Sequence, residues 1–262
     1  MLFLSGPPGA GKGTQASLLV ADFGLLVRGT DGNDAPTPRS PAHSYIPVSD
    51  GHGVTRRCGV VHISVGALLR AQLASPSPDL PAATLAEIVS VLRQGGILRG
   101  AATVALLRAE VARIQREVRR TEGEDVVPVF VIDGFPRSKD NLTQFEENFC
   151  PLDSVLSLSC SDVSVRSRLA RRGREDDDPA VIERRLRGFK SDTEPAIQLF
   201  RERKREAAVP APADDPAASS VRALHAFYAV DGEPPINDVY AQIKPLFVRF
   251  VQQHFNGGGG KR

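Results

Sequence analysis

A glycine-rich segment near the N-terminus combines the residue types and the spacing that bind phosphate groups. It follows the apolar run at residues 2–5 and reads Gly6-Pro7-Pro8-Gly9-Ala10-Gly11-Lys12-Gly13-Thr14. Glycines leave backbone N–H groups open to phosphate oxygens, and a helix that begins there adds the positive end of its dipole. Lys12 supplies an ammonium for the β- and γ-phosphates. The G-x-x-x-x-G-K spacing therefore predicts binding of a nucleoside triphosphate, with the usual hydroxyl displaced from Gly13 to Thr14.

A second group follows a strongly apolar run at residues 127–132 and reads Asp133-Gly134-Phe135-Pro136-Arg137. A carboxylate at the end of a strand can orient the water ligands of Mg²⁺. Arg137 offers a planar fork for a phosphate. An Asp-Gly pair alone is most often only a turn, but its combination with the phosphate-binding segment favours a functional site.

A third group is basic and surrounds a short hydrophilic segment at residues 173–178. Its members are Arg168, Arg171, Arg172, Arg174, Arg184, Arg185 and Arg187. A solvated helix face, balanced by the acidic residues 175–178, is one interpretation. The other is a small lid, because phosphoryl transfer needs positive charge over the equatorial oxygens of the moving group.

The elements that must position these groups alternate between strands and helices. We expect strands at residues 2–5, 60–63, 126–132, 155–158 and 221–230. We expect helices at 12–23, 66–73, 81–94, 102–120, 141–149, 163–172 and 236–255, and two more within 179–205. This order predicts an α/β fold with a five-stranded parallel sheet and helices on both faces. Ligands of such sheets bind at the carboxyl ends of the strands, where the three groups fall.

The remaining sequence is consistent with one domain over residues 1–262. Residues 28–58 and 206–220 are rich in Gly, Pro, Ala, Ser or Asp and predict surface insertions, and residues 256–262 predict a flexible tail. The net charge of +2 gives no argument for nucleic acid, and no apolar run is long enough for a membrane. Three scattered cysteines predict free thiols. We expect a cytoplasmic monomer, with the nucleus as the second candidate compartment.

The chain resembles the adenylate kinase-like nucleoside monophosphate kinases. The resemblance rests on residues 6–15, on His62-Ile63-Ser64-Val65-Gly66-Ala67-Leu68-Leu69-Arg70, on residues 133–137, and on Asp176-Asp177 with Thr193-Glu194-Pro195. It implies a P-loop NTPase-like sheet, a helical acceptor region at 65–100 and a short lid at 172–178. It also implies in-line transfer of the γ-phosphoryl group of ATP, with Mg²⁺, to a nucleoside monophosphate.

The resemblance further implies a role for individual residues. Residues 9–14 would hold the phosphates of ATP, and Asp133 would bind Mg²⁺ through water. Arg70 and Arg137 would hold the phosphate of the acceptor. Positive charge from the lid and its flanks would come from Arg168, Arg172, Arg174 and Arg185.

The base of the acceptor is predicted from the residue four positions after Arg137. Adenylate kinases carry a glutamine there and UMP/CMP kinases an asparagine, and this chain has Asn141. Val65 is apolar, as in the UMP/CMP type, and Gly96, Ile97 and Leu98 would give backbone contacts to the acceptor. We therefore predict a UMP/CMP kinase of the short-lid type, although asparagine is also a common helix N-cap.

Three departures from the family pattern keep alternatives open. Ala67 stands where the family has aspartate, Arg99-Gly100 replaces the usual continuation, and the lid is shorter after Gly173. An adenylate kinase is the nearest alternative. A catalytically weakened nucleotide sensor and a scaffold that acts through the insertions are the others.

Overall fold

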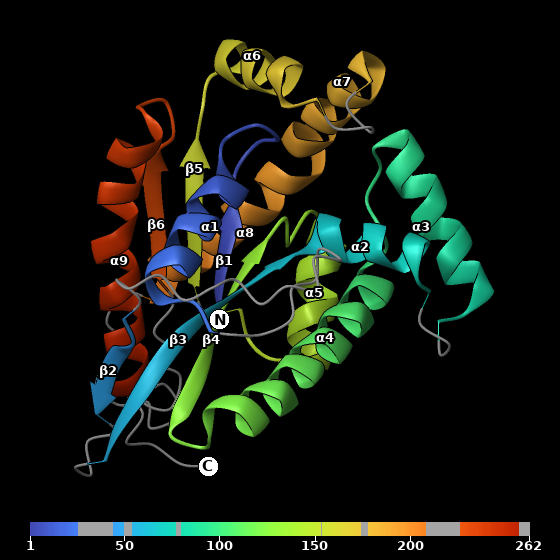
Figure 1. Cartoon of the computed structure of the whole chain (residues 1–262). Coiled ribbons are helices and arrows are strands. Elements are labelled where there is room, and N and C mark those ends of the chain that lie inside the picture. Colours follow the sequence, from blue (N-terminus) through green and yellow to red (C-terminus); the bar gives the residue numbers. More distant parts are fainter. Residues whose placement is uncertain are drawn as a thin grey trace.

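The structure is a computed structural model that describes residues 1–25, 44–49, 54–76, 80–152, 154–173, 178–207 and 226–256. Its centre is one six-stranded sheet with the order β2-β3-β4-β1-β5-β6. The strands are β1 (Leu2–Ser5), β2 (Ile46–Ser49), β3 (Thr55–Ser64), β4 (Val126–Asp133), β5 (Ser154–Ser159) and β6 (Ala226–Asp231). Five are mutually parallel and β2 pairs antiparallel to β3 at the edge. The predicted α/β class is confirmed (Figure 1).

The helices agree with the predicted ranges to within two residues at most ends. They are α1 (Lys12–Phe23), α2 (Val65–Ala74), α3 (Ala82–Gln94), α4 (Gly100–Glu122), α5 (Lys139–Asn148), α6 (Asp162–Arg172), α7 (Pro179–Gly188), α8 (Glu194–Ala207) and α9 (Ile236–Asn256). One π-helical turn, Phe189–Thr193, joins α7 to α8. Among the described residues, no helix is long and apolar enough to span a membrane.

The sixth strand corrects the prediction of a surface insertion at residues 28–58. Ile46 pairs with Cys58, and Ser49 with Thr55, so both ends of this segment join the sheet. Ile46 and Val48 are buried under α9 while Pro47 is exposed, which is the alternation of a half-buried strand. Four residues of alternation inside a Gly- and Pro-rich stretch are too short a signal to stand out from its composition. Residues 26–43 and 50–53 lie outside the described part.

The sheet separates two apolar layers. Helices α4, α5 and α8 contribute to the cluster on one face, and α1 and α9 to the cluster on the other. The alternation within β1 shows how the sequence builds both, because Phe3 packs into the first cluster while Leu2 and Leu4 pack into the second. All three side chains are at most 1% exposed, so β1 is the centre of the core.

The strand register brings the chemically important loops to one edge. Leu4 of β1 and Ser64 of β3 both lie opposite Asp133 of β4, so these three strands end together. Helices α2 and α3 extend beyond this edge on one side, and α6 and α7 stand over it on the other (Figure 1). The space between them is the cleft described next.

Candidate functional site

The phosphate-binding segment is a tight loop between β1 and α1. Gly6 and Gly9 have φ values of 136° and 86°, which side chains with a Cβ rarely adopt. A Cβ at Gly6 would lie 2.4 Å from the carbonyl oxygen of Leu158, and one at Gly9 would lie 2.9 Å from that of Val165. The two glycines therefore let the loop pack directly against the end of β5 and against α6.

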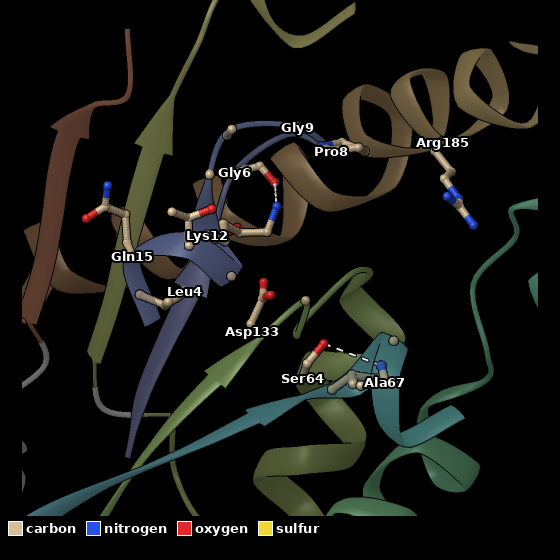
Figure 2. A pocket seen from close by; sticks show the side chains of 18 of the residues that line it. Leu4, Gly6, Pro8, Gly9, Lys12, Gln15, Ser64, Ala67, Asp133 and Arg185 are labelled. Atoms are coloured by element: carbon tan, nitrogen blue, oxygen red, sulfur yellow. Dashed lines mark hydrogen bonds between the residues drawn. The ribbon is translucent and has the colours of Figure 1, made fainter. Parts of the chain in front are cut away.

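Lys12 turns back into this loop (Figure 2). Its Nζ donates to the carbonyl oxygens of Gly6 and Pro7, at 2.8 and 3.0 Å. Burial is the largest cause that lowers the pKa of Lys12; Asp133 opposes this shift, and Arg137 and Arg172 add to it. A buried ammonium near two guanidinium groups is strained electrostatically until an anion arrives, so the site is suited to phosphate.

Asp133 faces Lys12 from the end of β4 (Figure 2). Its side chain is 15% exposed, and His62 Nε2 lies 4.0 Å from Oδ2. Its Oδ1 is buried and has no hydrogen-bond partner among the described residues. A buried carboxylate oxygen without a partner is costly, which fits a position that a hydrated cation completes.

The donor set fits Mg²⁺ better than metals that prefer nitrogen or sulfur. The described residues contain no cluster of three or more His, Cys, Asp or Glu side chains. One carboxylate at Asp133 and the exposed Thr14 line the cleft beside the phosphate loop. Mg²⁺ is typically held by one or two carboxylates with water and substrate phosphates, so this sparse set is sufficient.

The segment that follows β4, residues 134–136, holds Arg137 at the cleft. Phe135 is 1% exposed and its ring centroid lies 5.9 Å from that of Phe3, so the segment is fixed in the core. The next-but-one residue, Arg137, is half-buried, and its Nη1 donates to Gly96 O at 3.4 Å. Burial is the main cause that lowers the pKa of Arg137, and Arg185 lowers it further.

One cleft of about 1480 Å³ collects most of the predicted residues. It is lined by Lys12, Arg70, Asp133, Arg137, Arg168, Arg172 and Arg185, together with Gly9, Gly96 and Gly134. Arg185 stands apart from Lys12 and Asp133, so the cleft is open (Figure 2). Single-ligand pockets are typically about 300–1,000 Å³, so this cleft has room for two nucleotides. Arg174 lies outside the described residues, as does most of the lid predicted at 172–178.

The acceptor-side residues do not all reach this cleft. Ile97 and Leu98 line a second cavity of about 530 Å³ that shares Gly96 and Arg137 with the first. Asn141 lines neither cavity and is 1% exposed. Its Nδ2 donates to Leu98 O at 3.1 Å, and its Oδ1 accepts from the backbone N–H of Arg137 at 3.2 Å.

The helix-capping interpretation of Asn141 is wrong. Ser138 is the N-cap of α5, and its hydroxyl accepts from the backbone N–H of Asn141 at 3.1 Å. An N-cap side chain accepts from the N–H two or three residues after it, as Ser138 does here. Asn141 is therefore inside the helix, where its amide joins two segments of the acceptor side.

Sequence reasoning missed the loop at residues 232–236, which lines one end of the cleft. Its Glu233 accepts from Ser164 Oγ at 2.6 Å and from the backbone N–H of Ser161 at 2.5 Å, and its backbone oxygen accepts from Arg168 at 3.2 Å. The bonds to its carboxylate, led by that of Ser164 and followed by those of Ser161, lower the pKa of Glu233 to about 2. The position of this loop after the last parallel strand was the available signal. His62 and Gln15, which also line the cleft, lie within the motifs that carry the family resemblance, but the sequence assigned neither of them a role.

Comparison with known proteins adds an independent line of evidence. The family model described as adenylate kinase matches residues 50–205. An adenylate kinase of Synechococcus sp. (strain CC9311) is 31% identical over 78% of this chain and 85% of its own length. The UMP-CMP kinase of Prunus armeniaca is 27% identical over 90% of this chain and 91% of its own. The UMP-CMP kinase of Lentinula edodes is 29% identical over 76% of this chain and 73% of its own length.

Proposed function

The chain belongs to the adenylate kinase family and is a nucleoside monophosphate kinase, and we propose that its acceptor is a pyrimidine nucleotide. The proposed reaction converts ATP and UMP or CMP into ADP and UDP or CDP. One bond forms and one breaks at the γ-phosphorus. An oxygen of the acceptor phosphate bonds to it as its bond to the β,γ-bridging oxygen breaks. The leaving oxygen remains on ADP.

The observation that carries the proposed phosphoryl transfer is the large cleft, which has positive charge on several sides. Arg137 and Arg172 are close enough to Lys12 for their charges to lower its pKa. Asp133, which faces Lys12, opposes this shift. Phosphoryl transfer leaves little covalent chemistry to the protein, so positioning and charge neutralisation supply most of the rate enhancement. This cleft offers both, with room for two nucleotides.

The donor half of the cleft surrounds the phosphate loop. Backbone N–H groups of residues 9–14 and the start of α1 would hold the β- and γ-phosphates, with Lys12 exchanging its bonds to Gly6 and Pro7 for phosphate oxygens. Arg168 and Arg172 would flank the donor from α6, and Arg174 would act from the lid. Asp133 would hold Mg²⁺ through water, and the ion would supply positive charge to offset that of the phosphates.

The acceptor half lies toward α2 and α3. Arg70 in the middle of α2 and Arg137 after β4 would grip the acceptor phosphate, and Arg185 would add charge from α7. An arginine fork matches phosphate geometry bidentately. Gly96, which lines the cleft, would contact the acceptor there, and Ile97 and Leu98 would do so from the cavity beside it.

The pyrimidine preference is supported by residue types at two positions. Asn141 has the shorter amide, and Val65 is apolar and lines the cleft. UMP-CMP kinases are among the relatives along most of the chain. In the described conformation the amide of Asn141 is bonded to Leu98 O and to the N–H of Arg137 and is 1% exposed, so a contact to the base requires the amide to become exposed to the cleft.

Adenylate is the second candidate acceptor. An adenylate kinase of Synechococcus sp. (strain RCC307) is 32% identical over 77% of this chain, slightly more than the UMP-CMP kinases. If AMP is the acceptor, the buried amide of Asn141 acts only as a structural link and reads no base.

A panel of acceptors separates these candidates. Initial rates with Mg²⁺-ATP and UMP, CMP, dCMP or AMP are expected to give kcat/KM values at least tenfold higher for a pyrimidine than for AMP. Asn141→Gln is expected to narrow this ratio, and Asn148→Gln, on the exposed side of the same helix, is the matched control. AMP as the sole good acceptor would refute the pyrimidine proposal. ATP binding without turnover of any acceptor would support a nucleotide sensor instead.

A further inference from the structure

We propose that Asp140 is a positioning residue that fixes the acceptor loop, defined as residues 95–100, against Arg137. The proposal rests on the proposed function, since it treats this loop as a wall of the acceptor site. Asp140 lies in the first turn of α5; it lines the second cavity beside Ile97 and Leu98 but not the large cleft. Its effect on the large cleft is therefore exerted through the loop.

The first observation is a short hydrogen bond across the start of α4. The backbone N–H of Gly100, the first residue of α4, donates to Asp140 Oδ2 at 2.6 Å. The N-cap residue of α4, Arg99, provides no side-chain cap of its own. The first N–H groups of a helix need a partner, and a carboxylate there also complements the helix dipole. Asp140 thus caps α4 from a different helix.

The second observation is a close approach that only glycine permits. A Cβ at Gly100 would lie 2.7 Å from the backbone oxygen of Asp140, 2.8 Å from its Oδ2 and 2.8 Å from Gln144 Cγ. These distances are shorter than a van der Waals contact, so the start of α4 is held directly against α5. The segment Arg99-Gly100, which departs from the family pattern, is thereby explained at Gly100.

The same turn of α5 also holds Leu98 and Arg137. Asn141, the next residue after Asp140, bonds Leu98 O and the N–H of Arg137. Arg137 in turn donates from Nη1 to Gly96 O at 3.4 Å. The acceptor loop and the arginine that is proposed to grip the acceptor phosphate are therefore fastened to one turn of helix.

The opposite side of the acceptor loop is fastened to α3. The backbone N–H of Arg99 donates to Glu87 Oε1 at 3.1 Å, and its Nε lies 2.9 Å from Glu87 Oε2. Arg99 Nη2 also donates to Thr84 Oγ1 at 3.4 Å. The loop thus transmits the position of α5 to α3, a helix whose Val91 and Leu92 line the large cleft. Loss of the Asp140 bond should therefore loosen the acceptor wall while leaving the donor half unchanged.

The test compares Asp140→Ala with Asp140→Asn, because the asparagine keeps an oxygen that can accept from Gly100. Steady-state KM values are measured separately for the preferred acceptor and for ATP. We expect Asp140→Ala to raise the acceptor KM about tenfold, since a hydrogen bond to a charged group is worth about this factor. The KM for ATP should stay within twofold, and Asp140→Asn should recover most of the loss. Asp125→Ala is the matched control. Asp125 directly precedes β4, and its carboxylate pairs with Arg57 on the surface.

Amide hydrogen exchange provides a readout that does not depend on turnover. Asp140→Ala should accelerate exchange at Gly100 and its neighbours in the acceptor loop and leave the phosphate loop protected. The proposal is overturned if the acceptor KM is unchanged, or if the KM values of both substrates rise together with general loss of protection. Absence of kinase activity with every acceptor in the wild-type chain would instead overturn the proposed function, and accelerated exchange at Gly100 would still be measurable.

Discussion

Replacement of Lys12 by methionine separates the electrostatic role of its ammonium from its role in the fold. Methionine keeps the volume of the side chain and removes the charge. In the described conformation Nζ donates to Gly6 O and Pro7 O, at 2.8 and 3.0 Å. Pro7 O also accepts from the backbone N–H of Ala10 at 3.1 Å, so the substitution removes the Lys12 partner from both oxygens but leaves Pro7 with another.

The two effects on stability oppose each other. Loss of hydrogen bonds to a charged donor costs about 1.5–3 kcal/mol each. Burial lowers the pKa of Lys12, so the folded protein also holds this charge at an energetic cost that methionine removes. We expect a net change of about 1 kcal/mol or less, which shifts the Tm of a chain of this size by about 2–4 °C.

The effect on catalysis has no such compensation. Removal of one preorganised donor that acts on transition-state charge typically lowers kcat about 100- to 1,000-fold. Initial rates of ADP formation at saturating substrates, with Tm measured by differential scanning fluorimetry, test this expectation. Lys244→Met is the control, because Lys244 of α9 pairs with Asp22 of α1 and neither residue lines the cleft. A kcat within threefold of wild type, or a Tm loss above about 10 °C, would refute the reasoning.

Three further predictions concern backbone geometry, pH dependence and thiol reactivity. Gly6→Ala should destabilise the protein more than Gly11→Ala, because both residues have positive φ but only a methyl group at position 6 would meet a neighbouring atom within 4 Å. Urea unfolding measures the two losses in free energy of unfolding, and equal losses would contradict the prediction. The difference in Tm between wild type and Glu233→Gln should be greatest above pH 4.5 and should decrease as the pH falls toward 2. A carboxyl group whose pKa is lowered in the folded protein contributes stability that protonation removes. A difference in Tm that stays constant over this range would contradict the prediction. Burial raises the pKa of Cys58 to about 12, so mass spectrometry after iodoacetamide at pH 8 should find Cys58 the last of the three cysteines to be alkylated.

The sequence predicted the fold well where periodicity and motifs agreed. The bounds of β1 and α1 match the predicted ranges, because an apolar run, a glycine loop and a helical stripe all point to the same boundary. The strand β2 was missed although its partners in β3 lie only 6 to 12 residues away, because four alternating residues inside a Gly- and Pro-rich stretch are too short a signal.

The sequence predicted the site residues whose role follows from their residue type within a motif. It did not predict those whose role depends on contacts made in the folded chain. Lys12, Arg70 and Asp133 were named from motifs, and all three line the cleft. The bonds of Asn141 to Leu98 and Arg137 depend on how α5 packs against the acceptor loop, 43 residues away from Leu98 along the chain. Glu233 reaches Ser161, the N-cap of α6, across 72 residues. Neither spacing carries a motif, so only the folded chain shows these contacts.

The most direct test of the central claim follows the γ-phosphate of ATP. The wild-type chain is incubated with Mg²⁺ and ATP labelled at the γ-phosphorus, together with equimolar UMP, CMP and AMP, and the labelled products are separated by ion-exchange chromatography. The account predicts label on the β-phosphate of UDP or CDP, with ADP formed in equal amount, and loss of this transfer in Lys12→Met. Label found only in inorganic phosphate, or left entirely on ATP, would contradict phosphoryl transfer at this cleft.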